Sequence, residues 1–230
     1  MKSVYLFLLL PFFLLATPTP SRNNSRIAQI FTTVNGLPDN TINDIQKDKE
    51  GYLWIATNKG IARFDGKNFI SFSKNTHPLF FEDNVVNEIQ IDDNRIYLIS
   101  TKFGVKILDR IRLTIKSFIT DPVRSFDIKN NHQLVLKNNG DLELYRHFKK
   151  EKTQSFAQFD PKSAIFYRNT ICVLSQGKGI VQSKNTSLEV EKIIPADSIY
   201  MYGRLVISKK LGLIYSTGNR VYVLHQNLFV

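Results

Sequence analysis

Residues 48–66 read Asp-Lys-Glu-Gly-Tyr-Leu-Trp-Ile-Ala-Thr-Asn-Lys-Gly-Ile-Ala-Arg-Phe-Asp-Gly, and this stretch decides the fold. An apolar segment, Tyr52 to Thr57, meets a glycine turn, and a second apolar segment, Ile61 to Asp65, follows. The same order recurs at residues 95–109, 133–145, 170–182 and 212–224. The turn glycines lie 44, 36, 39 and 39 residues apart, at Gly60, Gly104, Gly140, Gly179 and Gly218. A strand–turn–strand unit with a period near 40 residues predicts the blades of a β-propeller.

The repeats predict an all-β chain with about five four-stranded blades, which form either a complete small ring or part of a seven-bladed ring. The blades are expected at about residues 36–75, 84–119, 122–159, 163–194 and 197–230. In the first blade, Ile42 and Ile45 are expected to point to the core. The outermost strand of the third blade is expected at about residues 153–159. Because one blade cannot bury both faces of its sheet, aromatic side chains such as Trp54 and Phe64 are expected to pack between blades.

The two ends of the repeat array do not match. The fifth unit lacks a clear outer strand, and residues 27–33 precede the first unit as an unpaired apolar segment. One interpretation is a five-bladed ring that residues 27–33 close by pairing with residues 220–224. The other is the first part of a larger ring, which the abrupt end at Gln226-Asn-Leu-Phe-Val230 favours because it lacks a terminal polar cap. An open array would leave an exposed strand edge.

Residues 1–21 are typical of a secretory signal peptide. One basic residue, Lys2, precedes a thirteen-residue apolar run from Val4 to Ala16, and a polar stretch continues to Ser21. The run is short for a bilayer crossing, and Pro11 interrupts it. We therefore expect the repeats, residues 22–230, to be periplasmic or secreted. An uncleaved signal anchor would leave them outside the cytosol as well.

The chain carries 31 Lys and Arg against 20 Asp and Glu, which gives a formal net charge of +11. The basic residues are spread over every repeat, and the longest runs are the doublets at 149–150 and 209–210. Nucleic-acid binding needs clustered positive charge with interleaved aromatic residues, so no nucleic-acid partner is expected. The single cysteine, Cys172, lies in an apolar run and is expected to be a buried strand thiol.

Residues 36–72 closely resemble the two-component regulator propeller repeat. The matching segments are Gly36-Leu-Pro-Asp-Asn-Thr-Ile-Asn-Asp-Ile-Gln-Lys-Asp48, Gly51-Tyr-Leu-Trp-Ile-Ala-Thr57, Gly60-Ile-Ala-Arg-Phe-Asp-Gly66 and Phe69-Ile-Ser-Phe72. Ala56 replaces the glycine that is usual in the family, and the later units match mainly by their period. The resemblance implies the periplasmic sensor region of a bacterial hybrid two-component histidine kinase. Because no kinase motif follows, the chain resembles the opening part of such a sensor, or a stand-alone remnant.

The sequence offers no catalytic set, no cofactor motif and no metal-ligand spacing, and its four histidines are scattered over different units. The acidic stretches 48–50 and 92–94 are consistent with calcium ligands, but hairpin turns account for them better. The candidate ligand contacts lie in the loops that lead into the innermost strands. They are Asp39, Asn40 and Asn84.

The resemblance favours a ligand-sensing module that responds to an oligosaccharide and acts through a homodimer. One alternative is a stand-alone secreted scaffold for protein partners. A less favoured alternative is a polysaccharide lyase or hydrolase, with Asp44, Glu88 and Asp127 near the mouth of the ring. The chain itself is expected not to be an enzyme, and a membrane contact is expected only through a signal anchor or a downstream helix.

Overall fold

The structure is a computed structural model that describes residues 29–77, 85–184, 187–195, 204–208, 210–217, 220–225 and 228–229. The chain divides into two compact units, Met1–Ile30 and Phe31–Val230, and the described strands all lie in the second. The expected signal peptide lies outside the described residues, and so do Asn84 and Gly218. Within the described ranges, no helix combines the length and the apolar character that a bilayer crossing requires.

The described residues of the unit Phe31–Val230 form five four-stranded antiparallel sheets, which confirms the predicted fold class. Blade 1 contains β1 (Ile42–Lys47), β2 (Leu53–Thr57), β3 (Gly60–Phe64) and β4 (Phe69–Phe72). Blade 2 contains β5 (Glu88–Asp92), β6 (Arg95–Ser100), β7 (Gly104–Asp109) and β8 (Thr114–Ile119). Blade 3 contains β9 (Val123–Lys129), β10 (His132–Lys137), β11 (Asp141–Arg146) and β12 (Lys149–Ser155). Blade 4 contains β13 (Pro161–Tyr167), β14 (Thr170–Ser175), β15 (Gly179–Lys184) and β16 (Val190–Ile194), and blade 5 contains β17 (Arg204–Ser208), β18 (Gly212–Thr217), β19 (Arg220–His225) and β20 (Leu228–Phe229).

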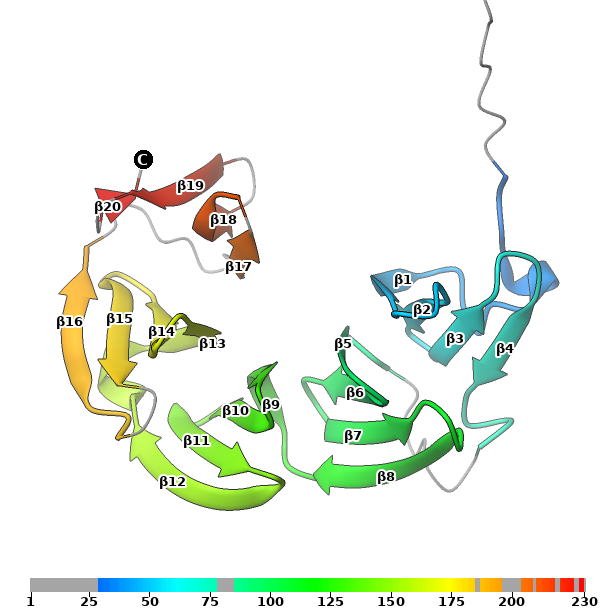
Figure 1. The fold of residues 1–230 in the computed structure, drawn as a ribbon, viewed down its shortest axis with the longest axis horizontal. Helices are drawn as coiled ribbons and strands as arrows, with labels where there is room; N and C mark the ends of the chain where they lie inside the picture. The colour runs from blue at the N-terminus through cyan, green and yellow to red at the C-terminus, as the bar shows by residue number, and fades with distance from the viewer. Residues whose placement is uncertain are drawn as a thin grey trace, which may run out of the picture. The chain divides into compact units, whose positions relative to one another are not determined.

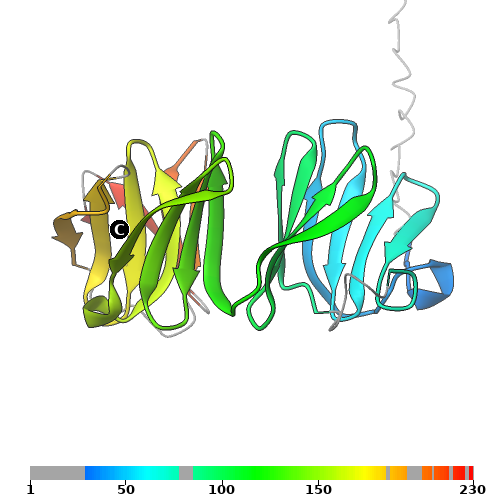
Figure 2. The same cartoon turned by 90° about the horizontal axis from the view of Figure 1, so that it is seen from below.

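The first strand of each blade lies innermost and the fourth lies on the outside (Figure 1). β1 contacts β5, β5 contacts β9, β9 contacts β13, and β13 contacts β17. Successive blades are therefore neighbours through their inner strands. Figure 2 shows the same blades from the side, with the hairpin turns gathered at the two ends of the strands. Side chains of the inner strands from several blades can thus face one shared space.

Neighbouring blades pack face to face through apolar side chains, because each sheet has two apolar faces. Trp54 and Ala56 of blade 1 pack with Ile89 and Leu98 of blade 2, and all four are buried. Comparable clusters join blades 2 and 3, blades 3 and 4, and blades 4 and 5. Cys172 lies in the last of these clusters as a free buried thiol, as predicted, and burial raises its pKa.

A glycine begins the third strand of blade 1 because two constraints meet there. Gly60 has a φ of +119°, which L residues with a Cβ rarely adopt. A Cβ at this position would also lie 2.1 Å from the backbone carbonyl oxygen of Phe72 on β4. Gly104, Gly140 and Gly179 occupy the corresponding turns of blades 2 to 4, each with positive φ. At Gly60 and Gly104 the glycine thus allows the close approach of the turn to the outer strand of the same blade.

The sequence predicted the outer strand of blade 3 at residues 153–159. In the structure this strand is β12, Lys149–Ser155, so the prediction was wrong. Arg146 pairs with Lys149, so only His147 and Phe148 form the turn between β11 and β12. Both turn residues have positive φ, of 48° and 67°, which suits a tight two-residue hairpin. The prediction failed because neither residue is a glycine or an asparagine, the usual signal for such a turn.

Of the two interpretations of the array ends, the five-bladed ring needed residues 27–33 as a closing strand, and the described part of this segment forms no strand. Residues 29–32 are not in a strand, and Thr33–Asn35 form a 3₁₀ turn capped by Thr32. Phe31 packs edge-on against Phe64, with ring centroids 4.9 Å apart. Phe64 therefore contacts this segment rather than a second blade. The described part of blade 5 has a short outer strand instead, since β20 pairs with β19.

Ile42 and Ile45 do not point to the core, contrary to the prediction, since their exposed fractions are 40% and 52%. Ile45 pairs with Ile55, so both side chains lie on the face of blade 1 that is turned away from blade 2. Phe31 and Leu37 cover the part of this face that β2 to β4 form. The part that β1 forms stays exposed, because in the described unit no further sheet packs there.

Candidate functional site

A pocket of about 660 Å³ lies where the inner strands of the blades meet. Its lining comes from blades 1 to 5, and most of it comes from β5, β9, β13 and β17. The polar lining residues include Gln46, Glu88, Gln90, Arg124, Asp127 and Lys162. The apolar lining residues include Ile89, Phe126, Ile165, Leu205 and Ile207. We call this space the central pocket, and it is large enough for a small organic ligand.

Two carboxylates and two cations balance the formal charge of the central pocket. On the acidic side, the Gln90 side-chain amide donates to Glu88 over 3.0 Å and to the Phe126 carbonyl over 2.7 Å. On the basic side, Arg124 donates to the Pro161 carbonyl over 2.5 Å. A lining that mixes hydrogen-bond donors, acceptors and apolar groups suits a neutral ligand that is rich in hydroxyl groups.

Lys162 completes the basic side of the central pocket. Its Nζ lies 2.9 Å from the Asp160 carboxylate, and its side chain is about one-fifth exposed. Arg124 lies farther from the same carboxylate, at 4.0 Å. Because Asp160 is shared with Arg124, it only partly neutralises the two cations. Both cations can therefore still donate to a ligand.

Asp127 is the most perturbed acid of the central pocket. It lies on β9, and its carboxylate accepts a 2.6 Å hydrogen bond from the Phe166 N–H of β13. Burial raises the pKa of Asp127 to about 6, and the charge of Glu88 adds to this effect. The backbone N–H groups of Phe166 and Ile128 act in the opposite direction. This carboxyl group therefore titrates near neutral pH while it joins blades 3 and 4.

Asp44 makes a similar contact two blade junctions earlier. Its carboxylate accepts a 2.9 Å hydrogen bond from the Ile89 N–H, so it joins blade 1 to blade 2. At the equivalent position of blade 3, the Ser125 hydroxyl accepts from the Ala164 N–H over 2.9 Å. Asp44 does not line the central pocket, whereas Glu88 and Asp127 do. The three acids therefore do not all face one space.

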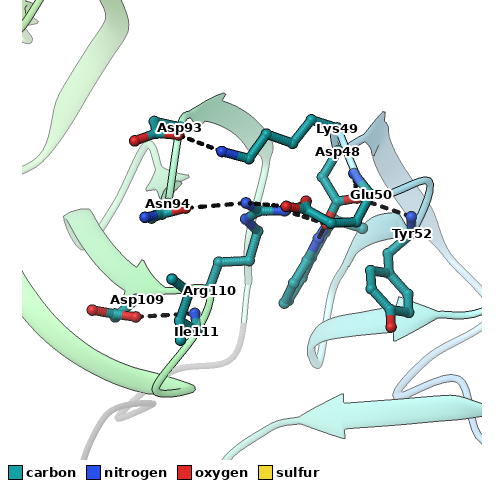
Figure 3. A network of polar contacts seen from close by, with 10 residues as sticks. Asp48, Lys49, Glu50, Tyr52, Asp93, Asn94, Asp109, Arg110 and Ile111 are labelled. Carbon is teal, nitrogen blue, oxygen red and sulfur yellow. Dashed lines mark hydrogen bonds and ion pairs between the residues drawn. The ribbon is translucent and has the colours of Figure 1, made fainter.

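A buried ion pair holds blades 1 and 2 together away from the central pocket (Figure 3). Arg110, which follows β7, lies 3.1 Å from the Asp48 carboxylate, and it also pairs with Glu50. Asp48 accepts from the Trp54 indole over 2.9 Å and from the Tyr52 N–H over 2.9 Å. Burial alone would raise the pKa of Asp48, but these hydrogen bonds and Arg110 outweigh it and lower the pKa. The network is structural, because its groups bind one another.

The acidic stretches form turns, as predicted. Asp48 to Gly51 close the turn between β1 and β2, and the Gly51 N–H donates to the Asp48 carbonyl over 3.1 Å. Asp93 and Asn94 lie in the turn between β5 and β6. Among the described residues, no group of three or more His, Cys, Asp or Glu side chains is placed to hold a metal ion.

Asp39 and Asn40, two of the three predicted ligand contacts, lie just before β1 and do not line the central pocket. Asp39 accepts from the Thr41 N–H over 2.8 Å, and Lys59 pairs with it at 3.1 Å. The Thr41 N–H and Lys59 lower the pKa of Asp39. Asn40 accepts from the Thr33 N–H over 2.9 Å. A ligand role for these two residues stays a prediction, and Asn84 lies outside the described residues.

Sequence reasoning missed Gln90, Arg124 and Lys162, because each is an ordinary polar residue in its own repeat. The available signal was their place on the first strand of their units, since those strands face the common centre of a propeller. Glu88 and Asp127 were recognised by this rule, but only as acids of a less favoured enzyme.

The repeated blades and the pocket at their inner strands define a β-propeller architecture. Its first blade carries a two-component regulator propeller repeat, since residues 36–59 match the family model of that description. The match spans β1, β2 and the turn to Gly60, as the resemblance predicted.

Two further proteins are similar to this chain, one in sequence and one in fold. Histidine kinase P4 of Formosa agariphila is 32% identical over 75 residues, which are 33% of this chain and 6% of that protein. The extracellular domain of a protein assigned as a hybrid two-component system in B. thetaiotaomicron has the same fold. The TM-score is 0.70 at 16% identity, over 88% of this chain and 31% of that one.

PorZ of Porphyromonas gingivalis, an essential surface component of the type IX secretion system, also shares the fold. The TM-score is 0.69 at 21% identity, over 86% of this chain and 28% of that one. The chain therefore spans less than a third of the length of each of these similar proteins.

Proposed function

We propose that this chain is a ligand-binding propeller segment of an extracytoplasmic sensor in a two-component system. The observation that carries the proposal is the central pocket, which five blades line together in a chain that bears a two-component regulator propeller repeat. The apolar run of residues 4–16 supports export to the periplasm or secretion. Histidine kinase P4 supports the link to a kinase output.

We further propose that the ligand is an oligosaccharide. The central pocket offers amide groups, carboxylates and cations of balanced charge, together with apolar surface such as that of Ile165. Sugar hydroxyls both donate and accept hydrogen bonds, so they can use both kinds of polar group. A ligand in this pocket would contact several blades at once. Its binding free energy would favour one arrangement of those blades over others. A sensor can transmit the presence of its ligand through such a shift between conformations.

Thermal stabilisation by a panel of neutral oligosaccharides tests the proposal. We expect at least one sugar to raise the melting temperature of the wild-type protein, because a ligand stabilises the state that it binds. Glu88→Gln and Lys162→Gln should reduce the shift, since both residues line the central pocket. Lys152→Gln is the matched control, because Lys152 lies exposed on the outer strand β12.

No shift across the panel would count against an oligosaccharide ligand. A specific protein partner retrieved by the same protein, without a small-ligand response, would favour the scaffold alternative. The enzyme alternative has one observation in its favour, which is the raised pKa of Asp127 beside Glu88. Turnover of a polysaccharide by the wild type, and its loss in Asp127→Asn, would replace the sensor proposal with that alternative.

A further inference from the structure

A second pocket, of about 200 Å³, lies between blades 3 and 4. Leu144 and Phe166 give it a buried apolar lining, and both belong to the core that joins the two blades. The rest of the lining is polar and comes from the ends of β9 and β11, from β10 and β12, and from the turns that follow β9 and β13. These residues are Lys129, Asn130, His132, Arg146, Glu151, Arg168 and Asn169. We call this space the junction pocket.

The junction pocket carries an excess of positive charge. Lys129, Arg146 and Arg168 contribute three cations, and Glu151 is the single carboxylate of the lining. His132 is hydrogen-bonded at both ring nitrogens, and its Nε2 accepts a 3.1 Å hydrogen bond from Arg146. Its Nδ1 then carries the hydrogen and donates to the Asn130 carbonyl over 3.0 Å. An anion would therefore be attracted here, unlike in the charge-balanced central pocket.

The two arginines keep donors for a ligand. Arg146 uses Nε for both His132 and Glu151, and no described residue accepts from its two terminal nitrogens. Arg168 places its guanidinium 5.3 Å from the centroid of the Tyr167 ring, and no described carboxylate pairs with it. The forked guanidinium geometry matches the two oxygens of a carboxylate.

Arg168 also occupies a backbone position that disfavours arginine. It is the first residue of the two-residue turn between β13 and β14, with a φ of +53°. The corresponding turns of blades 2 and 3 begin with Asp93 and Asn130, at +47° and +50°. Asp and Asn tolerate this conformation far better than a long side chain does. Strained residues often mark sites where a particular side chain is needed.

We propose that the junction pocket binds a single acidic sugar residue, a hexuronate. Arg146 and Arg168 would bind its carboxylate, and Asn130 and Asn169 would bind its hydroxyls. The apolar face of the ring would cover Phe166. The volume equals that of about seven waters at ~30 Å³ each, which admits one sugar ring but not a chain. The choice of a sugar rests on the proposed function, whereas the preference for an anion rests on this pocket alone.

Calorimetric titration of the wild-type protein with D-galacturonate and D-glucuronate tests the proposal. Glucose tests the need for the carboxylate, and acetate tests the need for the ring. We expect at least one of the two uronates to bind more tightly than glucose and more tightly than acetate. Binding should weaken as salt is raised, because the attraction is electrostatic.

Arg168→Asn is the decisive variant. We expect it to weaken uronate binding at least tenfold and to raise the melting temperature, because Asn relieves the backbone strain of the turn. A loss of binding together with a gain in stability cannot arise from misfolding. Arg112→Asn is the matched control, because Arg112 is an exposed arginine next to a residue of positive φ in the turn of blade 2.

Three results would overturn the proposal: no uronate binding, acetate binding as tight as that of the uronates, or uronate binding that Arg168→Asn leaves unchanged. Failure here is distinguishable from failure of the proposed function. If neutral oligosaccharides stabilise the protein through Glu88 and Lys162 while uronates do not bind, only the junction-pocket proposal fails. If uronates bind through Arg168 and no neutral sugar has an effect, only the neutral ligand of the central pocket fails.

Discussion

At the residue scale, the carboxylate of Asp48 connects its own turn, the rest of blade 1 and blade 2. It accepts hydrogen bonds from its own turn, from Trp54 of the same blade and from Arg110 of the next blade. The Asp48 side chain is fully buried, and that of Arg110 is 6% exposed. Isolated buried charges are costly, so each of the two depends on the other.

Arg110→Met should lower the free energy of unfolding by about 3–5 kcal/mol at pH 7, because it leaves the Asp48 carboxylate buried without its cation. Arg112→Met is the control. Its pair with Asp109 is exposed, so a loss of at most ~1 kcal/mol is expected. Urea denaturation of both variants measures the difference. Since the folded pKa of Asp48 is lowered, its contribution is present above pH 3.8 and is lost as the pH falls further. Equal small losses for both variants would contradict the buried pair.

Asp127 should make stability depend on pH in the opposite sense. Its folded pKa of about 6 lies above the ordinary value of 3.8, so the folded state binds the proton more tightly. The stabilising effect is complete below pH 3.8 and is lost as the pH rises through 6. Asp127→Asn removes this titration while it keeps an oxygen that can accept from Phe166. Urea denaturation at pH 5 and pH 7.5 should show a larger fall in stability for the wild type than for the variant. Equal falls would show that Asp127 titrates normally.

At the element scale, alanine substitutions at two glycines of blade 1 distinguish the cost of backbone strain from the cost of a steric clash. Gly60 and Gly66 both have positive φ, at 119° and 98°. A Cβ at Gly60 would collide with the backbone of β4, whereas a Cβ at Gly66 would meet no atom within 4 Å. Gly66→Ala should cost about 1–2 kcal/mol for the left-handed conformation alone. Gly60→Ala should cost a further ~1–3 kcal/mol, because β4 must move. Thermal denaturation compares the two, and equal losses would refute the steric argument.

The two faces of blade 1 should respond differently to truncation. Ile45 is 52% exposed, whereas its counterpart in blade 2, Ile89, is fully buried against blade 1. Phe126, Ala164 and Leu205 take the same place in blades 3 to 5 and are at most 5% exposed. Ile89→Ala should therefore cost about 2–5 kcal/mol of unfolding free energy.

Ile45→Ala in the same urea titration should cost less than ~0.5 kcal/mol, as exposed substitutions usually do. A loss as large as that of Ile89→Ala would show that another sheet or a second copy covers this face in solution.

At the scale of the whole molecule, the net charge of +11 should make stability depend on salt. Like charges repel one another in the compact state, and salt screens that repulsion. The melting temperature should rise by about a few degrees between 0.02 and 0.3 M NaCl. Lys152→Glu, on the exposed strand β12, should reduce this dependence. A melting temperature that falls with salt in both proteins would show that ion pairs outweigh the repulsion.

Much of the fold could be predicted because each blade is a local structure. The glycine at the start of the third strand, the Asp48 turn and the buried strand around Trp54 all depend on residues close in sequence. The errors concern contacts outside that range. Ile45 has the same alternating pattern as Ile89, and only the presence of a neighbouring blade distinguishes the two. The turn at His147 and Phe148 carries no usual turn residue, and Phe148 instead packs edge-on against Phe118 of blade 2, with ring centroids 5.2 Å apart.

The sequence by itself determined the repeat, the strand order within each blade and the family resemblance of residues 36–72, since these depend on periodicity and turn chemistry. Only the tertiary structure decided which polar side chains meet. Gln90, Arg124 and Lys162 come from three different blades, and their common pocket exists only when the inner strands lie side by side. The same holds for Arg110 with Asp48, which are 62 positions apart in the sequence. Such contacts cannot be predicted from sequence spacing, because these residues are brought together by the stacking of blades and not by the local conformation of the chain.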